Sequence, residues 1–179
     1  MHKTAFALIS MLAATSLALW AQAPRGRAST AGAVPQVHAD LNQLMRGVLY
    51  PAANVVFFAQ ADDPAAVKPA PDPSMATDPL ASTFGGWQAT ENAALALAES
   101  ATLMSMPGRV CSNGIPAPTR DPAWTAFVQE VRDASLQAYA AAKTKDQDRM
   151  AAVAETLSTA CAGCHRKWRD RRPAATRCK

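Results

Sequence analysis

Residues 146–172, DQDRMAAVAETLSTACAGCHRKWRDRR, are the stretch that decides the fold. Apolar side chains recur there every three or four residues, which is the spacing of one face of an α-helix: Met150, Val153, Leu157, Cys161 and Cys164. Asp146 or Thr144 is positioned to cap the start of this helix, and Pro173 stops it. The pattern predicts a helix that ends at about Arg171.

The same periodicity predicts three further helices upstream. The first covers Val37 to Ala61, with a kink near Gly47 because Pro51 removes a hydrogen bond one turn later. The second covers Gly86 to Met106, and the third begins at Asp121–Pro122, an N-cap followed by proline at the first helical position. Prolines between residues 64 and 79 predict a semi-rigid linker.

Composition agrees with a helical protein. The chain has 179 residues, of which 49% are hydrophobic, only 6% aromatic and 41 are alanine. Alanine favours helices and disfavours strands. Four helices with fairly short connections predict an all-α fold, an antiparallel up-down-up-down four-helix bundle over residues 36–172. Its core is short of bulky side chains.

The N-terminus carries a targeting signal. Residues 1–23, MHKTAFALISMLAATSLALWAQA, combine Lys3, an apolar run and a small-x-small cleavage site, so we expect a secretory signal peptide and a periplasmic protein. Pro24 hinders cleavage at that site, which leaves an uncleaved N-terminal anchor as the alternative. Residues 24–35 are expected to be a flexible segment, and no second run is long enough to span a membrane.

Cys161-Ala-Gly-Cys164-His165 is C-x-x-C-H, the attachment signature of a c-type haem. Two thiols three positions apart can each form a thioether with one haem vinyl group, and His165 can then bind the iron as proximal ligand. We expect one haem c per chain. A thioredoxin-like redox pair is less consistent with a chain without strands. A zinc site would need a second pair of cysteine or histidine ligands. A haem-free helical binding module with a Cys161–Cys164 disulfide is the remaining alternative.

These residues carry a resemblance to a known family. An exported four-helix bundle with C-x-x-C-H near the end of its last helix resembles the cytochrome c prime family. The run CAGCHRKWRDRR is similar to the family's C-x-x-C-H-x-x-aromatic-Arg pattern, with Trp168 and Arg169 at the last two positions, and LNQLMRGVLYP resembles its first helix. Pro51, the proline-rich linker and the Cys111 loop indicate a divergent member. The resemblance implies a proximal role for Arg169 and leaves a homodimer through the first two helices open.

Bundle geometry places the start of the first helix beside His165, which makes residues of that turn distal candidates: Leu41, Asn42, Leu44 and Met45. The other wall is expected from Met104, Met106, Trp124 and Phe127. An apolar cover would leave a five-coordinate iron that binds NO or CO. In the family an apolar residue does this, and Leu41 is its match, with Asn42 in the alternative register. Ligation by the Met45 thioether would instead give a six-coordinate, low-spin electron carrier.

Charge suggests two further roles. Arg46 and Arg109 lie near the same end and are candidates to pair with the haem propionates. From Arg166 to the C-terminus the chain carries +6, against −2 before it, and residues 173–179 form a basic tail. A solvated helix end explains this charge best, and a contact with an acidic redox protein is the alternative. We expect no nucleic-acid partner. Paired carboxylates, nucleophile–base sets and phosphate loops are missing, so enzymatic activity is not predicted.

Two cysteines remain after the haem motif is set aside. Cys111 lies in the second connection and Cys178 follows the last helix, so both map to the same end of the bundle. In an oxidising compartment such a pair forms a disulfide. We therefore predict a Cys111–Cys178 bridge, with a free or intermolecular Cys178 as the alternative.

Overall fold

The computed structural model describes residues 36–170 and 173–179, so the expected signal peptide and the segment up to residue 35 lie outside it. The described part contains four long helical segments and no strand; the one β feature there is an isolated bridge between Val110 and Pro116. The prediction of an all-α protein is confirmed. No helix within these residues is long and apolar enough to cross a membrane.

The first helical segment is interrupted by a π-helical turn. It consists of α1 (Leu41–Leu44), the π turn η1 (Met45–Leu49) and α2 (Tyr50–Ala61). The predicted start at Val37 is wrong: Asp40 is the N-cap and forms a capping box with Gln43. Pro51 cannot donate a backbone hydrogen bond, and the turn before it, where the kink was predicted, widens so that the Tyr50 N–H reaches the Met45 carbonyl.

The other three segments begin close to their predicted positions. The second is α3 (Gly86–Ser100), which continues as a 3₁₀ turn, η4 (Ala101–Ser105). The third is α4 (Pro122–Thr144), capped by Asp121 as predicted. The fourth is α5 (Gln147–Cys164), capped by Asp146, and it ends in a second π turn, η5 (His165–Arg169).

Short 3₁₀ turns order two of the connections. In the linker between α2 and α3 they are η2 (Pro73–Met75) and η3 (Pro79–Ala81), each preceded by an aspartate that caps it. The tail contains η6 (Ala174–Thr176). The linker is therefore built from proline-initiated turns, in keeping with the semi-rigid segment that was predicted.

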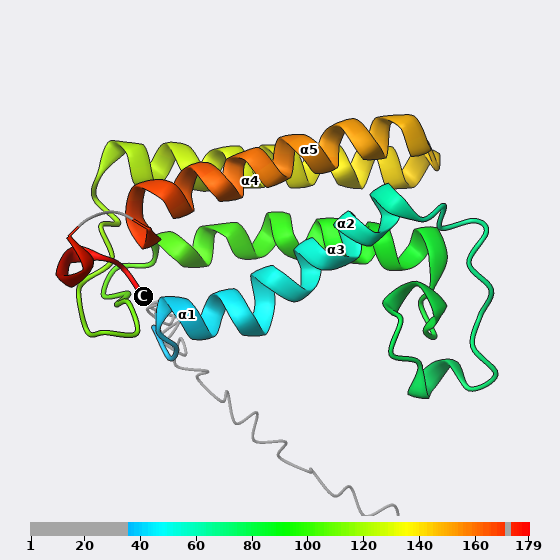
Figure 1. The fold of residues 1–179 in the computed structure, drawn as a ribbon, viewed down its shortest axis with the longest axis horizontal. Helices are drawn as coiled ribbons and strands as arrows, with labels where there is room; N and C mark the ends of the chain where they lie inside the picture. The colour runs from blue at the N-terminus through cyan, green and yellow to red at the C-terminus, as the bar shows by residue number, and fades with distance from the viewer. Residues whose placement is uncertain (1–35, 171–172) are drawn as a thin grey trace, which may run out of the picture. The chain divides into compact units, whose positions relative to one another are not determined.

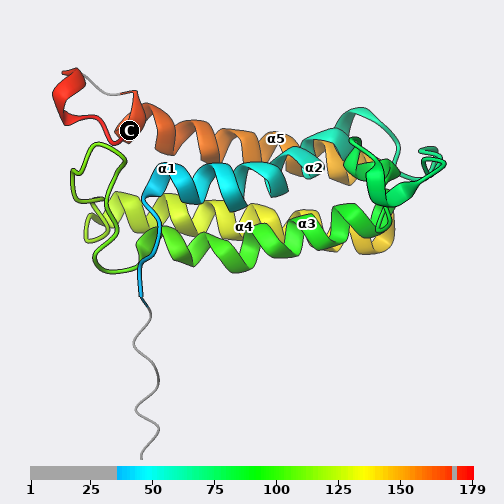
Figure 2. The ribbon, with the colours of Figure 1, turned by 90° about the horizontal axis from the view of Figure 1, so that it is seen from below.

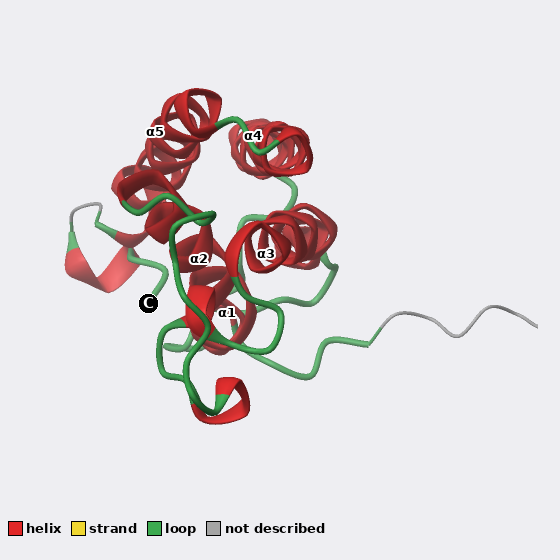
Figure 3. Cartoon of the chain, turned by 90° about the vertical axis from the view of Figure 1, so that its right-hand side faces the viewer, coloured by secondary structure: helices red, strands yellow, loops and turns green. Residues whose placement is uncertain are grey.

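The four segments pack side by side, α2 on α3 and α5, and α4 on α3 and α5 (Figures 1 and 2). Figure 3 looks along the helices and shows the four around a common centre. The Gln147 amide at the start of α5 donates to the Ala59 carbonyl near the end of α2 (2.8 Å), so these neighbours run in opposite directions. We call the end with the α2–α3 linker and the α4–α5 turn the far end, and the other end the near end.

Small side chains close the interior toward the far end. Ala138, Ala142 and Ala154 are completely buried, together with the larger Met150. Alanine lets helices approach closely, and close packing is what a stable interior needs. This part of the molecule is filled by the protein's own side chains.

The near end is tied together by a disulfide and by hydrogen bonds. Cys111 and Cys178 form the predicted bridge, which spans 67 residues of sequence. The Ser112 N–H donates to the Lys179 carbonyl, and the Cys178 N–H donates to the Trp168 carbonyl at 3.0 Å. The tail is thereby held against η5.

Candidate functional site

A cavity of about 920 Å³ opens at the near end, between the first helical segment and the α4–α5 pair. This volume lies in the upper part of the range for small-molecule sites. Its walls are largely apolar, with Leu41 and Leu49 on one side and Phe127 and Val128 on the other. The low aromatic content of the chain is thus accompanied by a large space that its own side chains leave unfilled.

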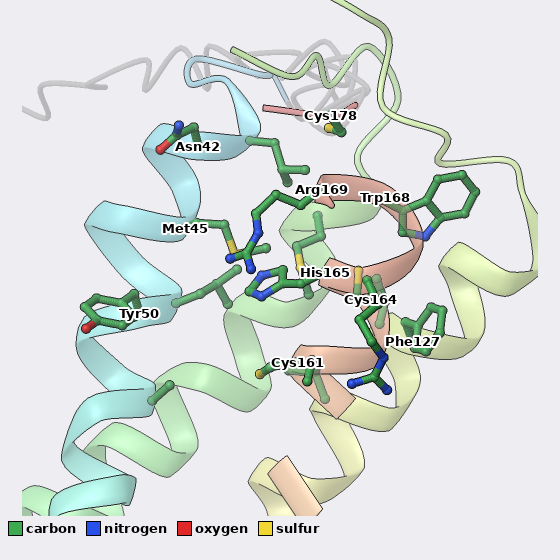
Figure 4. A pocket seen from close by; sticks show the side chains of 18 of the residues that line it. Asn42, Met45, Tyr50, Phe127, Cys161, Cys164, His165, Trp168, Arg169 and Cys178 are labelled. Atoms are coloured by element: carbon green, nitrogen blue, oxygen red, sulfur yellow. The ribbon is translucent and has the colours of Figure 1, made fainter. Parts of the chain in front are cut away.

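The three chemically active residues of the C-x-x-C-H motif all line this cavity. Cys161 and Cys164 are both free thiols, and both are half-buried, as is His165. Residues three and four apart share one face of a helix, so α5 brings the two thiols and the imidazole to the same wall. Figure 4 shows the His165 ring directed into the space between α5–η5 and the first helical segment.

Burial determines the protonation of these groups. It raises the pKa of the Cys161 thiol, and with Cys161 and Glu130 nearby it raises the pKa of Cys164 to about 11. Burial and the Arg169 cation lower the pKa of His165, against a smaller opposite effect of Asp170. At neutral pH the two thiols are protonated and the imidazole is neutral. The neutral imidazole is the form of histidine that binds metal ions.

The helix around the motif is shaped to fit the cavity. Gly163 has no side chain, and a Cβ there would lie 2.7 Å from Cε1 of Phe127, so glycine allows the ring of α4 to pack directly on α5. His165 opens the π turn η5, and π turns recur at functional sites. The two π turns found among the described residues, η1 and η5, both contribute residues to the cavity wall.

The distal candidates differ in how they meet the cavity. Leu41 is buried and lines it, and half-buried Met45 lines it with its side chain directed inward, toward the space into which His165 projects (Figure 4). Asn42 also lines the cavity, with its amide turned away from His165 (Figure 4). Leu44 is buried in the core and is not among the cavity walls.

The opposite wall contains two tryptophans. Trp124 is 1% exposed and packs edge-on against Trp168, with ring centroids 5.8 Å apart. Both indole N–H groups are buried without a hydrogen-bond partner among the described residues. Met104 lines the cavity as predicted, whereas Met106 does not and instead lies 3.7 Å from a guanidinium nitrogen of Arg109.

The predicted arginines have separate environments. Arg46 is exposed and lines the cavity, and Arg169 lines it while it pairs with Asp170 at 2.8 Å. Arg109 does not reach the cavity: its buried guanidinium donates to the Leu103 and Ala39 carbonyls. It fastens the start of α1 to η4, so its expected pairing with propionates is not supported.

The cavity also contains residues that sequence reasoning missed. Arg166 and Lys179 add cations to its edge, and Leu97, Val131 and Ser158 extend it toward the middle of the helices. The apolar periodicity of these helices carried the signal for Leu97 and Val131. For Lys179 the signal was the disulfide partner next to it.

The side chains of Cys161, Cys164 and His165 fit a haem site better than a site for a bare metal ion. Within the described residues no group of three or more His, Cys, Asp and Glu side chains is placed to hold a metal ion. Covalent attachment of a haem requires two free thiols, one neutral imidazole and a large apolar space. This cavity provides all of these together. Comparisons of the chain with family models, curated proteins and solved structures find no match.

Proposed function

We propose that this protein is a periplasmic c-type cytochrome with one covalently attached haem, similar to the cytochrome c prime family. The observation that carries the proposal is that the free thiols of Cys161 and Cys164 and the imidazole of His165 line one apolar cavity. The two thiols would hold the haem and His165 would bind its iron from the proximal side. The four helical segments would form an antiparallel up-down-up-down bundle around it.

When bound, haem supplies an iron that changes oxidation state or binds a small gas such as NO or CO. The protein's part is to hold and shield it. The apolar walls would keep water away from the iron, and exposed Arg46 on the cavity wall would pair with a propionate. We therefore propose a binding and electron-transfer protein rather than an enzyme.

Two residues compete for the distal side of the iron. Buried Leu41 supports a five-coordinate iron open to gas, because a leucine covers the metal without binding it. Half-buried Met45, directed into the cavity in Figure 4, supports a six-coordinate electron carrier. Methionine on an apolar helix face is usually a packing residue, so Leu41 remains the first proposal and Met45 the second.

One set of absorption spectra tests both. The protein is exported together with a cytochrome c maturation system, purified, and examined oxidised, reduced and with CO. A c-type spectrum that changes on CO binding supports the five-coordinate site. A methionine-to-iron charge-transfer band that disappears in Met45→Ala supports the second candidate. A purified, folded protein without haem absorbance would contradict the proposed function.

A further inference from the structure

Charge is divided unevenly between the two ends formed by residues 36–179, although the total charge of these residues is close to zero. Three of the 18 Lys and Arg residues precede residue 36 and none of the 14 Asp and Glu residues does, which leaves 15 cations and 14 acids in residues 36–179. Residues 36–179 together carry a formal charge of only +1 and so supply little net attraction for an anionic partner. Any such attraction has to come from the arrangement of their charges.

Basic side chains surround the opening of the cavity at the near end. We call five of them, all exposed, the basic rim: Arg46, Arg166, Lys167, Arg169 and Lys179. Four of the five line the cavity itself, the exception being Lys167, which lies over the Trp168 ring at 5.1 Å. η1, η5 and the disulfide-bonded tail hold the rim in place.

Three of the acids of the near end are engaged in caps or an ion pair. Asp40 and Asp121 accept backbone hydrogen bonds as helix caps, and Asp170 pairs with Arg169. With Arg109, Arg120 and Arg177 the described near end has eight cations. Against them stand five acids, because Glu99 near the end of α3 and Glu130 near Cys164 also belong to this end, and the terminal carboxylate. This leaves the near end of the protein itself with an excess of two positive charges.

The far end has the opposite balance. It carries six aspartates on the linker and on the α4–α5 turn: Asp62, Asp63, Asp72, Asp78, Asp146 and Asp148. Four cations accompany them: Lys68, Lys143, Lys145 and Arg149. The molecule therefore has an electric dipole whose positive end is the near end. In the field of an anionic partner this dipole orients the cavity toward the partner.

We propose that the basic rim is the docking surface for an acidic redox protein that exchanges electrons with this cytochrome. The inference rests on the proposed function. A ring of cations around the site of electron exchange attracts an acidic surface and orients it there before contact, which speeds association. A protein is favoured over an anionic membrane or nucleic acid because only a redox partner benefits from docking beside the iron. The contact is small, transient and sensitive to salt.

The test measures electron transfer from the reduced protein to an acidic blue-copper protein, used as probe, by stopped flow. The second-order rate constant should fall about tenfold or more between about 10 mM and about 300 mM salt, because added ions screen the attraction. Transfer to a basic blue-copper protein should not fall. This comparison needs no variant.

Charge reversal then locates the surface. Arg166→Glu with Lys167→Glu should slow transfer to the acidic probe at low salt and remove its salt dependence. The matched control, Lys143→Glu with Arg149→Glu, changes net charge equally at the far end and should keep the wild-type behaviour. The haem spectrum of each variant reports whether the site is intact.

Three results would overturn the proposal: a rate that does not depend on salt, equal effects of the two variant pairs, or a rate that rises with salt. Rim-dependent binding to phosphatidylglycerol vesicles without rim-dependent electron transfer would also overturn it and would assign the rim to a membrane surface. Absence of covalent haem would count against the proposed function instead and is measured separately on a denaturing gel.

Discussion

The near and far ends of this molecule are built from the same alanine-rich helices and differ in what fills the space between them. Toward the far end, completely buried residues such as Ala138, Ala142 and Met150 close the interior. At the near end the same helices enclose a cavity of about 920 Å³. Helices held in place at one end can remain apart at the other, and the π turns η1 and η5 lie at the open end.

The contrast explains how a chain with few aromatic residues leaves a large cavity open. Small side chains set the spacing of the helices where they touch, and large ones such as Trp124 and Phe127 are placed around the cavity rather than in its centre. The near end also has the disulfide and the clamp formed by Arg109. These cross-links replace the packing that the cavity lacks.

The largest expected effect separates the two pairs of cysteines. Cys161→Ala with Cys164→Ala should abolish covalent haem, because both free thiols that line the cavity are removed. Cys111→Ser with Cys178→Ser should retain it, because these sulfurs are bonded to each other. Haem staining on a denaturing gel makes the comparison. Loss of haem stain from the second pair only would reverse the assignment of the cysteines.

The next effect concerns the cross-link of the near end. The bridge between Cys111 and Cys178 closes 67 residues of chain, and the chain-entropy model assigns about 4 kcal/mol to a loop of that length. Cys111→Ser with Cys178→Ser should lower the free energy of unfolding in urea by roughly this amount. An unchanged urea midpoint would show that the bridge does not constrain the chain in solution.

A matched pair of substitutions compares the packing of the two ends directly. Ala138→Leu adds volume where the interior is closed and should destabilise the apoprotein by about 1–3 kcal/mol. Ala53→Leu adds the same volume at the cavity wall, where there is room, and should have little effect on the apoprotein but should reduce haem content. Urea unfolding and haem-to-protein absorbance ratios measure both. Equal destabilisation of the two apoproteins would show that there is no free space beside Ala53.

A smaller effect is expected in the reactivity of the site's thiols. Because burial and its neighbours raise the pKa of Cys164 to about 11, little of it is thiolate at pH 8 in the reduced apoprotein. Its alkylation by iodoacetamide should be about a hundredfold slower than in the urea-unfolded chain and should accelerate as pH rises toward 11. Equal rates in folded and unfolded protein would place the thiol in water.

The smallest effect concerns the exposed pair of Arg169 and Asp170. Both side chains are about half exposed, and exposed ion pairs contribute little because water and salt screen them. Asp170→Asn should therefore leave the urea midpoint unchanged within error. A clear loss of stability would show that the pair holds η5 in place.

The sequence predicted the helices well and the details of their faces less well. Asp121, Asp146 and the spacing of Cys111 and Cys178 carried direct signals, and the structure confirms them. The Asp40–Gln43 capping box is also visible in the sequence, as an aspartate followed three residues later by a glutamine. A uniform helical period does not anticipate π turns, and η1 widens the helix between α1 and α2. In the structure Leu44 packs in the core, whereas Leu49 at the end of η1 lines the cavity.

Sequence reasoning predicted the motif and part of the wall around it, since Met45, Met104 and Trp124 line the cavity as expected. Arg109 was expected at the propionates because charge alone does not reveal that its guanidinium is buried among backbone carbonyls. The basic rim depends on which segments meet at the near end, and sequence order conceals this. Arg46 and Lys179 are 133 positions apart in the chain and line the same cavity.

The most direct test of the central claim is the intact mass of the exported protein after denaturation in urea. A haem bound through thioethers stays with the chain, so the account predicts the mature polypeptide plus one haem, and the polypeptide alone for Cys161→Ala with Cys164→Ala. A wild-type mass equal to the polypeptide, in cells that attach haem to another c-type cytochrome, would contradict the account.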